Sequence, residues 1–115
     1  MDRSDLHSYF TEAFCHLLAL ELHARTGLSL WACVEPGLGG VHALVRLPDG
    51  RYLDVCGART SAEVRTDWPH AVMRRVSPAY FADWRRHDEI FGRADARLVR
   101  TTAARLLRQL DRAAA

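Results

Sequence analysis

Three residues in the N-terminal half of the chain, Cys15, His42 and Asp54, are of the types that together make a thiol nucleophile. A cysteine attacks a carbonyl carbon as its thiolate, so a nearby base, usually an imidazole, has to take the thiol proton. The imidazole must in turn be held in one tautomer and one orientation, usually by a carboxylate or an amide. The sequence therefore permits a Cys-His-Asp triad, provided that the fold brings the three side chains together.

The pairing of two predicted strands decides whether His42 and Asp54 can meet. Residues 41–47 and 51–56 are rich in β-forming residues and flank Pro48-Asp49-Gly50, which predicts a hairpin. If all three turn residues form the loop, with the glycine in the left-handed conformation, His42 and Asp54 lie diagonally on one face of the sheet. A two-residue Asp-Gly loop would shift the pairing by one residue and put them on opposite faces. The triad hypothesis therefore depends on a three-residue turn.

The chain has three cysteines, and Cys15 is the favoured source of the thiol. It lies on an amphipathic helix that must pack against the predicted sheet, near a helix start if that helix breaks between residues 8 and 11. Cys33 and Cys56 lie in predicted strands, where no helix dipole activates a thiol. The hairpin register nevertheless places Cys56 opposite His42, so Cys56 stays open as the alternative.

Each candidate residue also has a purely structural interpretation. Asp54 interrupts a strand that otherwise looks well packed, and a solvent-facing aspartate is the plain alternative. His42 could be an ordinary edge or core histidine, and most free cysteines are small buried hydrophobic residues. His16 follows Cys15 but points elsewhere on a helix, so we interpret it as a surface or packing residue.

The periodicity of the hydrophobic residues predicts an α+β chain, in the order helix, three strands, then helices. The first helix spans about residues 4–26 and ends at Gly27, and Thr11 could cap a second, central helix if the first one breaks. The further elements are a strand over 28–34, the hairpin, a short helix that begins at Thr60 or Ser61, a strand over 71–76, a helix from Ser77-Pro78 towards Phe91 that Gly92 breaks, and a last helix over about 94–112.

The length and composition indicate one globular domain, residues 1–115. Hydrophobic residues make up 49% and charged residues 26% of the chain, which is typical of a folded rather than a disordered protein. All 16 basic residues are arginines, so lysine-based Schiff-base chemistry is excluded. The cysteines form no Cys-x-x-Cys pair and are too few for a disulfide framework. We therefore expect free thiols, no metal site and no cofactor.

The basic charge is concentrated in the C-terminal part of the chain. Residues 72–115 contain 10 Arg against 5 Asp and Glu, whereas residues 1–71 contain 6 against 9. Such a surface could face an acidic partner or a nucleic acid, but solvated helix faces are the simpler interpretation, and no nucleic-acid-binding motif is present. No apolar run approaches the ~20 residues that span a bilayer, and the N-terminus lacks a signal-peptide layout. We expect a cytoplasmic protein, with export by a signal-free route left open.

Three segments taken together resemble papain-fold proteins of the transglutaminase-like branch, of which small bacterial and phage members are known. In that group a Cys begins the central helix, a His-Ala/Val-x-Val strand follows, and a Gly-Arg/Lys-x-x-Asp strand closes the triad. The matching segments here are the helix that begins at Cys15, the stretch Val41-His42-Ala43-Leu44-Val45-Arg46, and the stretch Asp49-Gly50-Arg51-Tyr52-Leu53-Asp54-Val55. The resemblance covers about residues 11–57, and residues 58–115 are unassigned.

The resemblance implies a fold and a reaction. The fold is a papain-like or transglutaminase-like core, with an N-terminal helix packed on a small antiparallel sheet and further helices at the C-terminus. Cys15 would be the nucleophile, His42 the general base and then acid, and Asp54 the residue that orients His42, with the backbone N–H of Cys15 in the oxyanion hole. Ala13-Phe14 stand where relatives commonly carry Gly and a small polar residue, which leaves open whether Cys15 begins a helix or lies inside a continuous one.

Two functions follow from this interpretation. The first is a thiol-dependent acyl-transfer enzyme that acts on a protein or peptide amide as a peptidase, a glutamine deamidase or a transglutaminase. The second is a catalytically inactive binding module on the same fold, motivated by Ala13-Phe14 and by the aromatic-rich stretch of residues 68–91.

Overall fold

The computed structural model describes residues 2–85 and 92–114 and has the predicted α+β class. Its helical elements are α1 (Arg3–Ser8), the π-helical turn η1 (Tyr9–Ala13), α2 (Cys15–Thr26), α3 (Ser61–Asp67), the 3₁₀-helix η2 (Pro78–Arg85) and α5 (Ala96–Ala114). Its strands are β1 (Leu30–Glu35), β2 (Gly39–Arg46), β3 (Tyr52–Asp54), β4 (Gly57–Arg59) and β5 (Val72–Val76).

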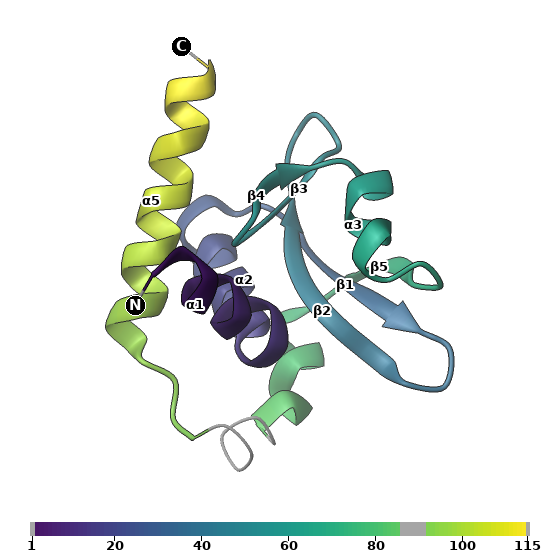
Figure 1. Cartoon of the computed structure of the whole chain (residues 1–115). Coiled ribbons are helices and arrows are strands. Elements are labelled where there is room, and N and C mark those ends of the chain that lie inside the picture. Colours follow the sequence, from purple (N-terminus) through teal and green to yellow (C-terminus); the bar gives the residue numbers. More distant parts are fainter. Residues whose placement is uncertain (1, 86–91, 115) are drawn as a thin grey trace.

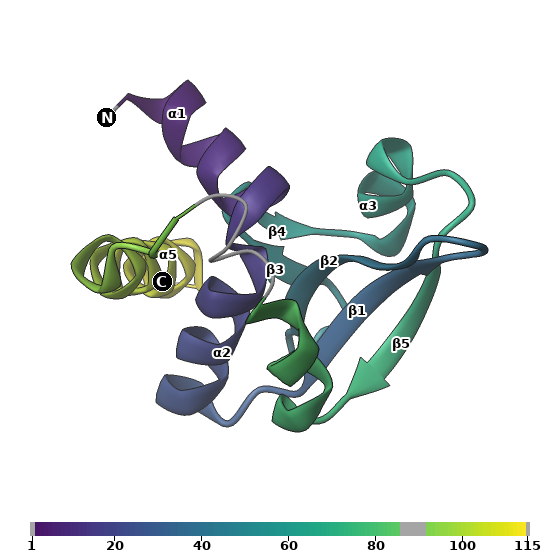
Figure 2. The ribbon, with the colours of Figure 1, turned by 90° about the horizontal axis from the view of Figure 1, so that it is seen from below.

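The strands form one antiparallel sheet in the order β4-β3-β2-β1-β5. Helix α2 packs on β2 and carries α5 on its outer side, whereas α3 lies on the other side of the sheet (Figure 1). The view from below shows the curved sheet standing between α2 and α3 (Figure 2). No helix among residues 2–85 and 92–114 combines the length and the apolar character needed to cross a membrane.

Helix α2 begins at Cys15, because the chain leaves the helical conformation one residue earlier. Phe14 has φ −121° and ψ 27°, which is outside the helical range. Its backbone N–H donates to the Tyr9 carbonyl at 2.9 Å and so closes the π-helical turn η1. The cap expected at Thr11 is wrong: its hydroxyl donates to the His7 carbonyl at 2.7 Å, inside the preceding helical segment. The break therefore falls three residues later than the expected one, where no capping residue type signals it.

The hairpin has the three-residue turn on which the triad hypothesis depends. The Leu47 N–H donates to the Arg51 carbonyl at 2.8 Å, and Gly50 takes the left-handed conformation with φ 91°. The ladder continues with Val45 opposite Leu53 and Arg46 opposite Tyr52. The predicted register is confirmed, and it puts His42 and Asp54 on one face of the sheet.

Two apolar clusters hold the sheet, one on each face. The larger cluster joins α2, η1 and α5 to the sheet and includes Phe10, Leu18, Leu22, Leu30, Ala43, Val45, Leu53, Ala103 and Leu106. The smaller cluster, on the α3 side, includes Cys33, Leu44, Tyr52, Val64 and Ala71, with Trp68 packed against it. Because side chains alternate along a strand, His42 shares the face of Leu44, and Asp54 shares the face of Tyr52.

The remaining elements differ from the expected ones mainly in extent. The strand expected at 71–76 is present as β5 and joins the same sheet as the hairpin, whereas β4, which has only three residues, was not expected. Thr60 caps α3 through a capping box with Glu63, as its sequence predicts. The helix expected from Ser77-Pro78 is a 3₁₀-helix that is described as far as Arg85, and its expected continuation over residues 86–91 lies outside the described residues.

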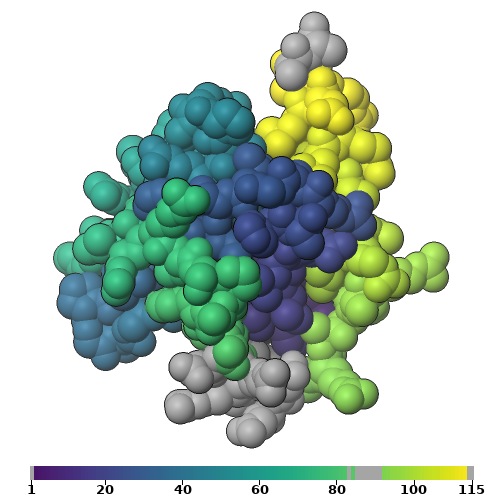
Figure 3. Space-filling model, turned by 180° about the vertical axis from the view of Figure 1, so that it is seen from behind, coloured from purple at the N-terminus to yellow at the C-terminus, as the bar shows by residue number. Residues whose placement is uncertain are grey.

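Aromatic side chains of η2 pack directly on the backbone of β2 at Gly40. A Cβ atom placed on Gly40 would lie 2.6 Å from the Trp84 ring and 2.8 Å from the Tyr80 hydroxyl. Only glycine allows this approach, which brings η2 alongside the first turn of α2, where Trp84 contacts the His16 ring. In the space-filling view from behind, η2 and α5 flank the surface of α2 (Figure 3).

We predict that Gly40→Ala lowers the free energy of unfolding by about 1–3 kcal/mol, because the added methyl group overpacks the contact with Trp84. The same substitution in a Trp84→Ala chain should cost clearly less, since the nearest atoms are gone. Urea denaturation of the four chains of this double-mutant cycle measures the difference. Equal costs in both backgrounds would show that Trp84 does not pack on Gly40 in solution.

Candidate active site

The predicted pair His42 and Asp54 forms a buried hydrogen bond between β2 and the end of β3. The His42 Nε2–H donates to Asp54 Oδ2 at 2.8 Å, and the two residues are 0% and 3% exposed. The backbone ladder between the two strands is confined to Val45–Leu53 and Arg46–Tyr52, so this bond bridges the strands beyond the end of the ladder. A buried imidazole and carboxylate have little water to hydrate them, and each depends on the other as a partner.

The Asp54 carboxylate accepts two further hydrogen bonds. The Arg59 guanidinium donates from Nη2 to Oδ2 at 2.7 Å, and the Cys56 backbone N–H donates to Oδ1 at 2.8 Å. Arg59 also donates from Nη1 to Asp67 Oδ2 at 2.9 Å, which ties β4 to the end of α3. The carboxylate is therefore fixed in orientation by two charged groups and one backbone donor.

Cys15, the first residue of α2, is a neighbour of His42. His42 Nδ1 is buried and has no partner at standard hydrogen-bond geometry within the described part of the chain. Cys15 nevertheless acts on the imidazole as a hydrogen-bonding and charged neighbour. Thiol–imidazole pairs in unliganded sites are commonly longer than ordinary hydrogen bonds. The structure thus joins Asp54 to His42 through Nε2, and the raised pKa of His42 shows that Cys15 belongs to the surroundings of the same imidazole.

The neighbours of His42 favour its protonated form. Burial lowers the pKa of His42, but hydrogen bonds to Asp54 and Cys15 and the negative charge on both outweigh burial and raise that pKa to about 9. Burial likewise raises the pKa of Asp54, but the hydrogen bond from His42 and the charges of His42 and Arg59 prevail and hold it below its usual range. At neutral pH the site therefore contains an imidazolium beside a carboxylate.

Trp68 covers one face of the His42 ring. The two rings stack with their centroids 4.5 Å apart and their planes 19° from parallel. Trp68 directly follows α3, whose last residue, Asp67, is already bonded to Arg59. Since the indole keeps water from one side of the imidazole, it strengthens the electrostatic coupling between His42 and Asp54.

The other two cysteines are placed unfavourably for nucleophilic attack. Cys33 lies directly opposite His42 in the β1–β2 ladder, but it is fully buried and its thiol donates to Met73 Sδ at 3.5 Å. Burial, with the charge of Asp54, raises the pKa of Cys33 to about 12 and that of the exposed Cys56 to about 11. Both thiols therefore stay protonated at neutral pH, which leaves Cys15 as the favoured candidate.

The sequence did not predict that Arg59, Asp67 and Trp68 lie beside the His42–Asp54 pair. A second short hairpin at Gly57 would have revealed Arg59, because the β3–β4 register places it opposite Tyr52, on the face of Asp54. Nothing local marks Trp68, whose stacking partner lies 26 positions earlier in the chain.

No set of three or more His, Cys, Asp or Glu side chains that could hold a metal ion occurs in residues 2–85 and 92–114. A scan of the chain against models of protein families finds no match, and searches of curated proteins and of solved structures find none either.

We predict that the His42–Asp54 pair makes stability depend on pH. Because the pKa of His42 is raised from 6.5 to about 9, its stabilisation is complete below about pH 6.5 and is lost as the pH rises through 9. The free energy of unfolding should fall by about 2–3 kcal/mol over this range, and Asp54→Asn should remove most of that fall. Urea denaturation between pH 6 and pH 10 measures both effects.

Asp67→Asn is the matched control, since Asp67 contacts Arg59 but makes no bond to His42. This variant should keep most of the pH dependence. If Asp54→Asn and wild type lose stability in parallel between pH 6.5 and pH 9, His42 does not draw its raised pKa from Asp54.

Proposed function

We propose that the protein is a thiol-dependent acyl-transfer enzyme that cleaves an amide bond with Cys15, His42 and Asp54. The observation that carries the proposal is the buried His42–Asp54 hydrogen bond, and it is supported by Cys15, the first residue of α2, whose thiol raises the pKa of the same imidazole. The resemblance to papain-fold proteins of the transglutaminase-like branch supports the same assignment. An α+β core with a helix on an antiparallel sheet is compatible with that fold.

The first half of the reaction forms a thioester. In the reactive pair the proton of the Cys15 thiol is held by His42, so that a thiolate faces the imidazolium, and the negative charge of Asp54 stabilises that imidazolium. The thiolate then attacks the carbonyl carbon of the amide. Because Cys15 opens α2, its N–H has no acceptor within the helix and is available to the oxyanion. His42 returns a proton to the leaving nitrogen as the C–N bond breaks, which releases an amine or, from a glutamine side chain, ammonia.

The second half breaks the thioester. Water, or an amine in the case of transglutamination, loses a proton to His42 and attacks the thioester carbonyl. The C–S bond breaks, and Cys15 leaves as a thiolate beside the imidazolium. Hydrolysis gives a carboxylic acid, and aminolysis gives a new amide. Peptidase, deamidase and transglutaminase activities differ in the substrate that fits and in the attacking group, not in the triad.

Burial of Cys15 favours a second candidate, a binding module that keeps the fold without catalysis. Cys15 is only 4% exposed and belongs to the larger apolar cluster. Catalysis requires that a substrate carbonyl reach the sulfur, and a small shift of the surrounding side chains would have to open that path. A binding module has no such requirement.

We predict that Cys15→Ser abolishes amide chemistry. A peptide mixture rich in glutamine, with an added primary amine, reports hydrolysis, deamidation and transamidation together by mass spectrometry. The serine variant should be slower by 10³-fold or more, on the order of the losses seen when a nucleophile is removed. Cys56→Ser is the control and should stay within about twofold of wild type. Undiminished turnover by Cys15→Ser would assign the activity to another residue.

The rate of alkylation separates the enzyme from the binding module. In native protein at pH 7, iodoacetamide should modify Cys15 faster than Cys33, because protonated His42 stabilises the thiolate. His42→Gln should slow that modification by on the order of tenfold, because the positive charge that favours the reactive thiolate is lost. A Cys15 that reacts as slowly as the fully buried Cys33 would support the binding module.

A further inference from the structure

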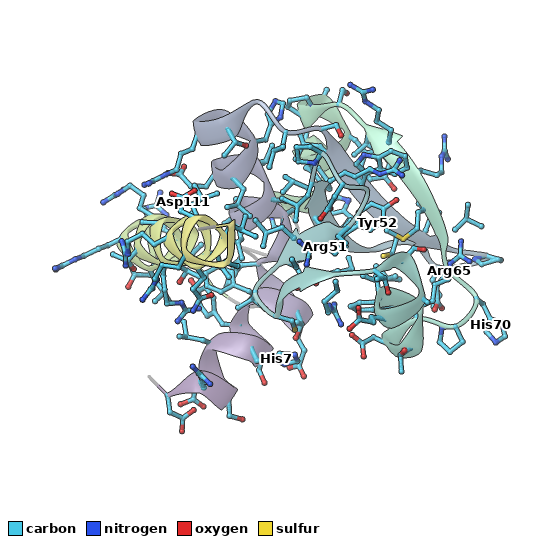
Figure 4. The ribbon with its side chains drawn as sticks, turned by 90° about the horizontal axis from the view of Figure 1, so that it is seen from above. His7, Arg51, Tyr52, Arg65, His70 and Asp111 are labelled. Carbon is cyan, nitrogen blue, oxygen red and sulfur yellow. The ribbon has the colours of Figure 1, made fainter. Side chains whose placement is uncertain are left out.

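A cavity of about 510 Å³ lies between α1, the turn from β3 to β4, and α5, apart from the Cys15–His42 contact. Three basic side chains line it: Arg3 and His7 from α1, and Arg105 from α5. None of the described residues that line it is acidic. His7 projects from α1 on the side of the molecule where β3 and β4 lie (Figure 4).

The two arginines carry positive charge that the described part of the chain leaves uncompensated. The ion pairs there involve Arg25, Arg51, Arg59 and His42, and neither Arg3 nor Arg105 is among them. Arg105 is partly buried, and its Nε is enclosed without a hydrogen-bond partner. Arg3 is exposed, so Arg105 is the enclosed group of the two. An enclosed guanidinium N–H without a carboxylate partner favours an incoming oxyanion, because it matches the geometry of the oxyanion and loses little hydration when it binds.

The rest of the lining fits a small organic molecule rather than a bare ion. Leu6 and Val55 supply apolar surface, and Ser4 and Gln109 supply neutral polar groups. The volume lies within the range of ordinary small-ligand sites, roughly 300–1,000 Å³, and exceeds what one phosphate or carboxylate group fills.

We propose that this cavity, lined by Arg3, His7 and Arg105, binds a small organic anion through its phosphate or carboxylate group. The apolar part of the ligand lies against Leu6 and Val55. The exposed Cys56 thiol is part of the same lining, so a bound ligand covers it. Cys56 also donates its backbone N–H to Asp54, which places the cavity next to the carboxylate of the candidate triad. The anion site does not depend on that triad being catalytic.

Phenyl phosphate is a suitable probe, with benzoate as the carboxylate form and benzyl alcohol as the neutral form. Isothermal titration calorimetry gives the affinity, and mass spectrometry follows the alkylation of Cys56 by neutral iodoacetamide. We expect phenyl phosphate or benzoate, but not benzyl alcohol, to bind and to protect Cys56. The anion that binds with the higher affinity identifies the preferred acidic group, phosphate or carboxylate. Binding without protection of Cys56, or no binding by either anion, would overturn the proposal.

Arg105→Gln tests the site directly and should weaken binding of the preferred anion by about tenfold, the loss expected for a charge-assisted hydrogen bond. Arg108→Gln is the matched control, because Arg108 is exposed on the same helix and lies outside the cavity lining. It should change the affinity by less than about twofold. Equal losses in the two variants would mean general charge attraction and no built site. If the glutamine variant does not fold, Arg105→Lys, which keeps the charge, is measured in its place.

Discussion

The buried carboxylate of Asp54 is the constraint on which the arrangement of the sheet depends. At 3% exposure it cannot rely on water, and an unpaired charge at this depth would cost several kcal/mol. It is balanced by His42 from β2, by Arg59 from β4 and by the N–H of Cys56 from the intervening turn. Three neighbouring segments must therefore stand in one register, and an error in any of them leaves a buried charge without a partner.

The same carboxylate also joins the two faces of the sheet. Arg59 reaches from Asp54 to Asp67 at the end of α3, and the next residue, Trp68, stacks on His42. Cys15, which raises the pKa of His42, belongs to the larger cluster under α2 on the other face of the sheet. Helices on both sides of the sheet are thus positioned relative to one charged group. Figure 4 shows Arg65 and His70 on the side of the molecule where α3 lies, and Asp111 on α5 at the opposite side.

The sequence predicted the features that depend on short-range rules. The turn at Gly50 sets the hairpin register through a local conformational preference, and the pairing of His42 with Asp54 follows from it. The α+β class and the end of α2 at Gly27 follow from periodicity and from a glycine cap. The stacking of Trp68 and the bond between Arg59 and Asp67 could not be predicted, because they depend on where α3 docks, which no local pattern encodes. The papain-like identity of the core stays a prediction.

The residue before Cys15 illustrates why a residue that breaks a local rule deserves a functional explanation. Phe14 occupies the N-cap of α2 and supplies no side-chain acceptor, although Ser, Thr, Asn or Asp there would stabilise the helix by about 1 kcal/mol. Such a side chain would bond to N–H groups of the first turn, where it would compete with an incoming oxyanion. Phe14 instead packs in the apolar cluster beneath α2, and no side chain caps the first turn of the helix. The bulky residue that made the helix start hard to foresee is therefore compatible with a nucleophile at that start, and it shifts the question of activity to how a substrate reaches the sulfur.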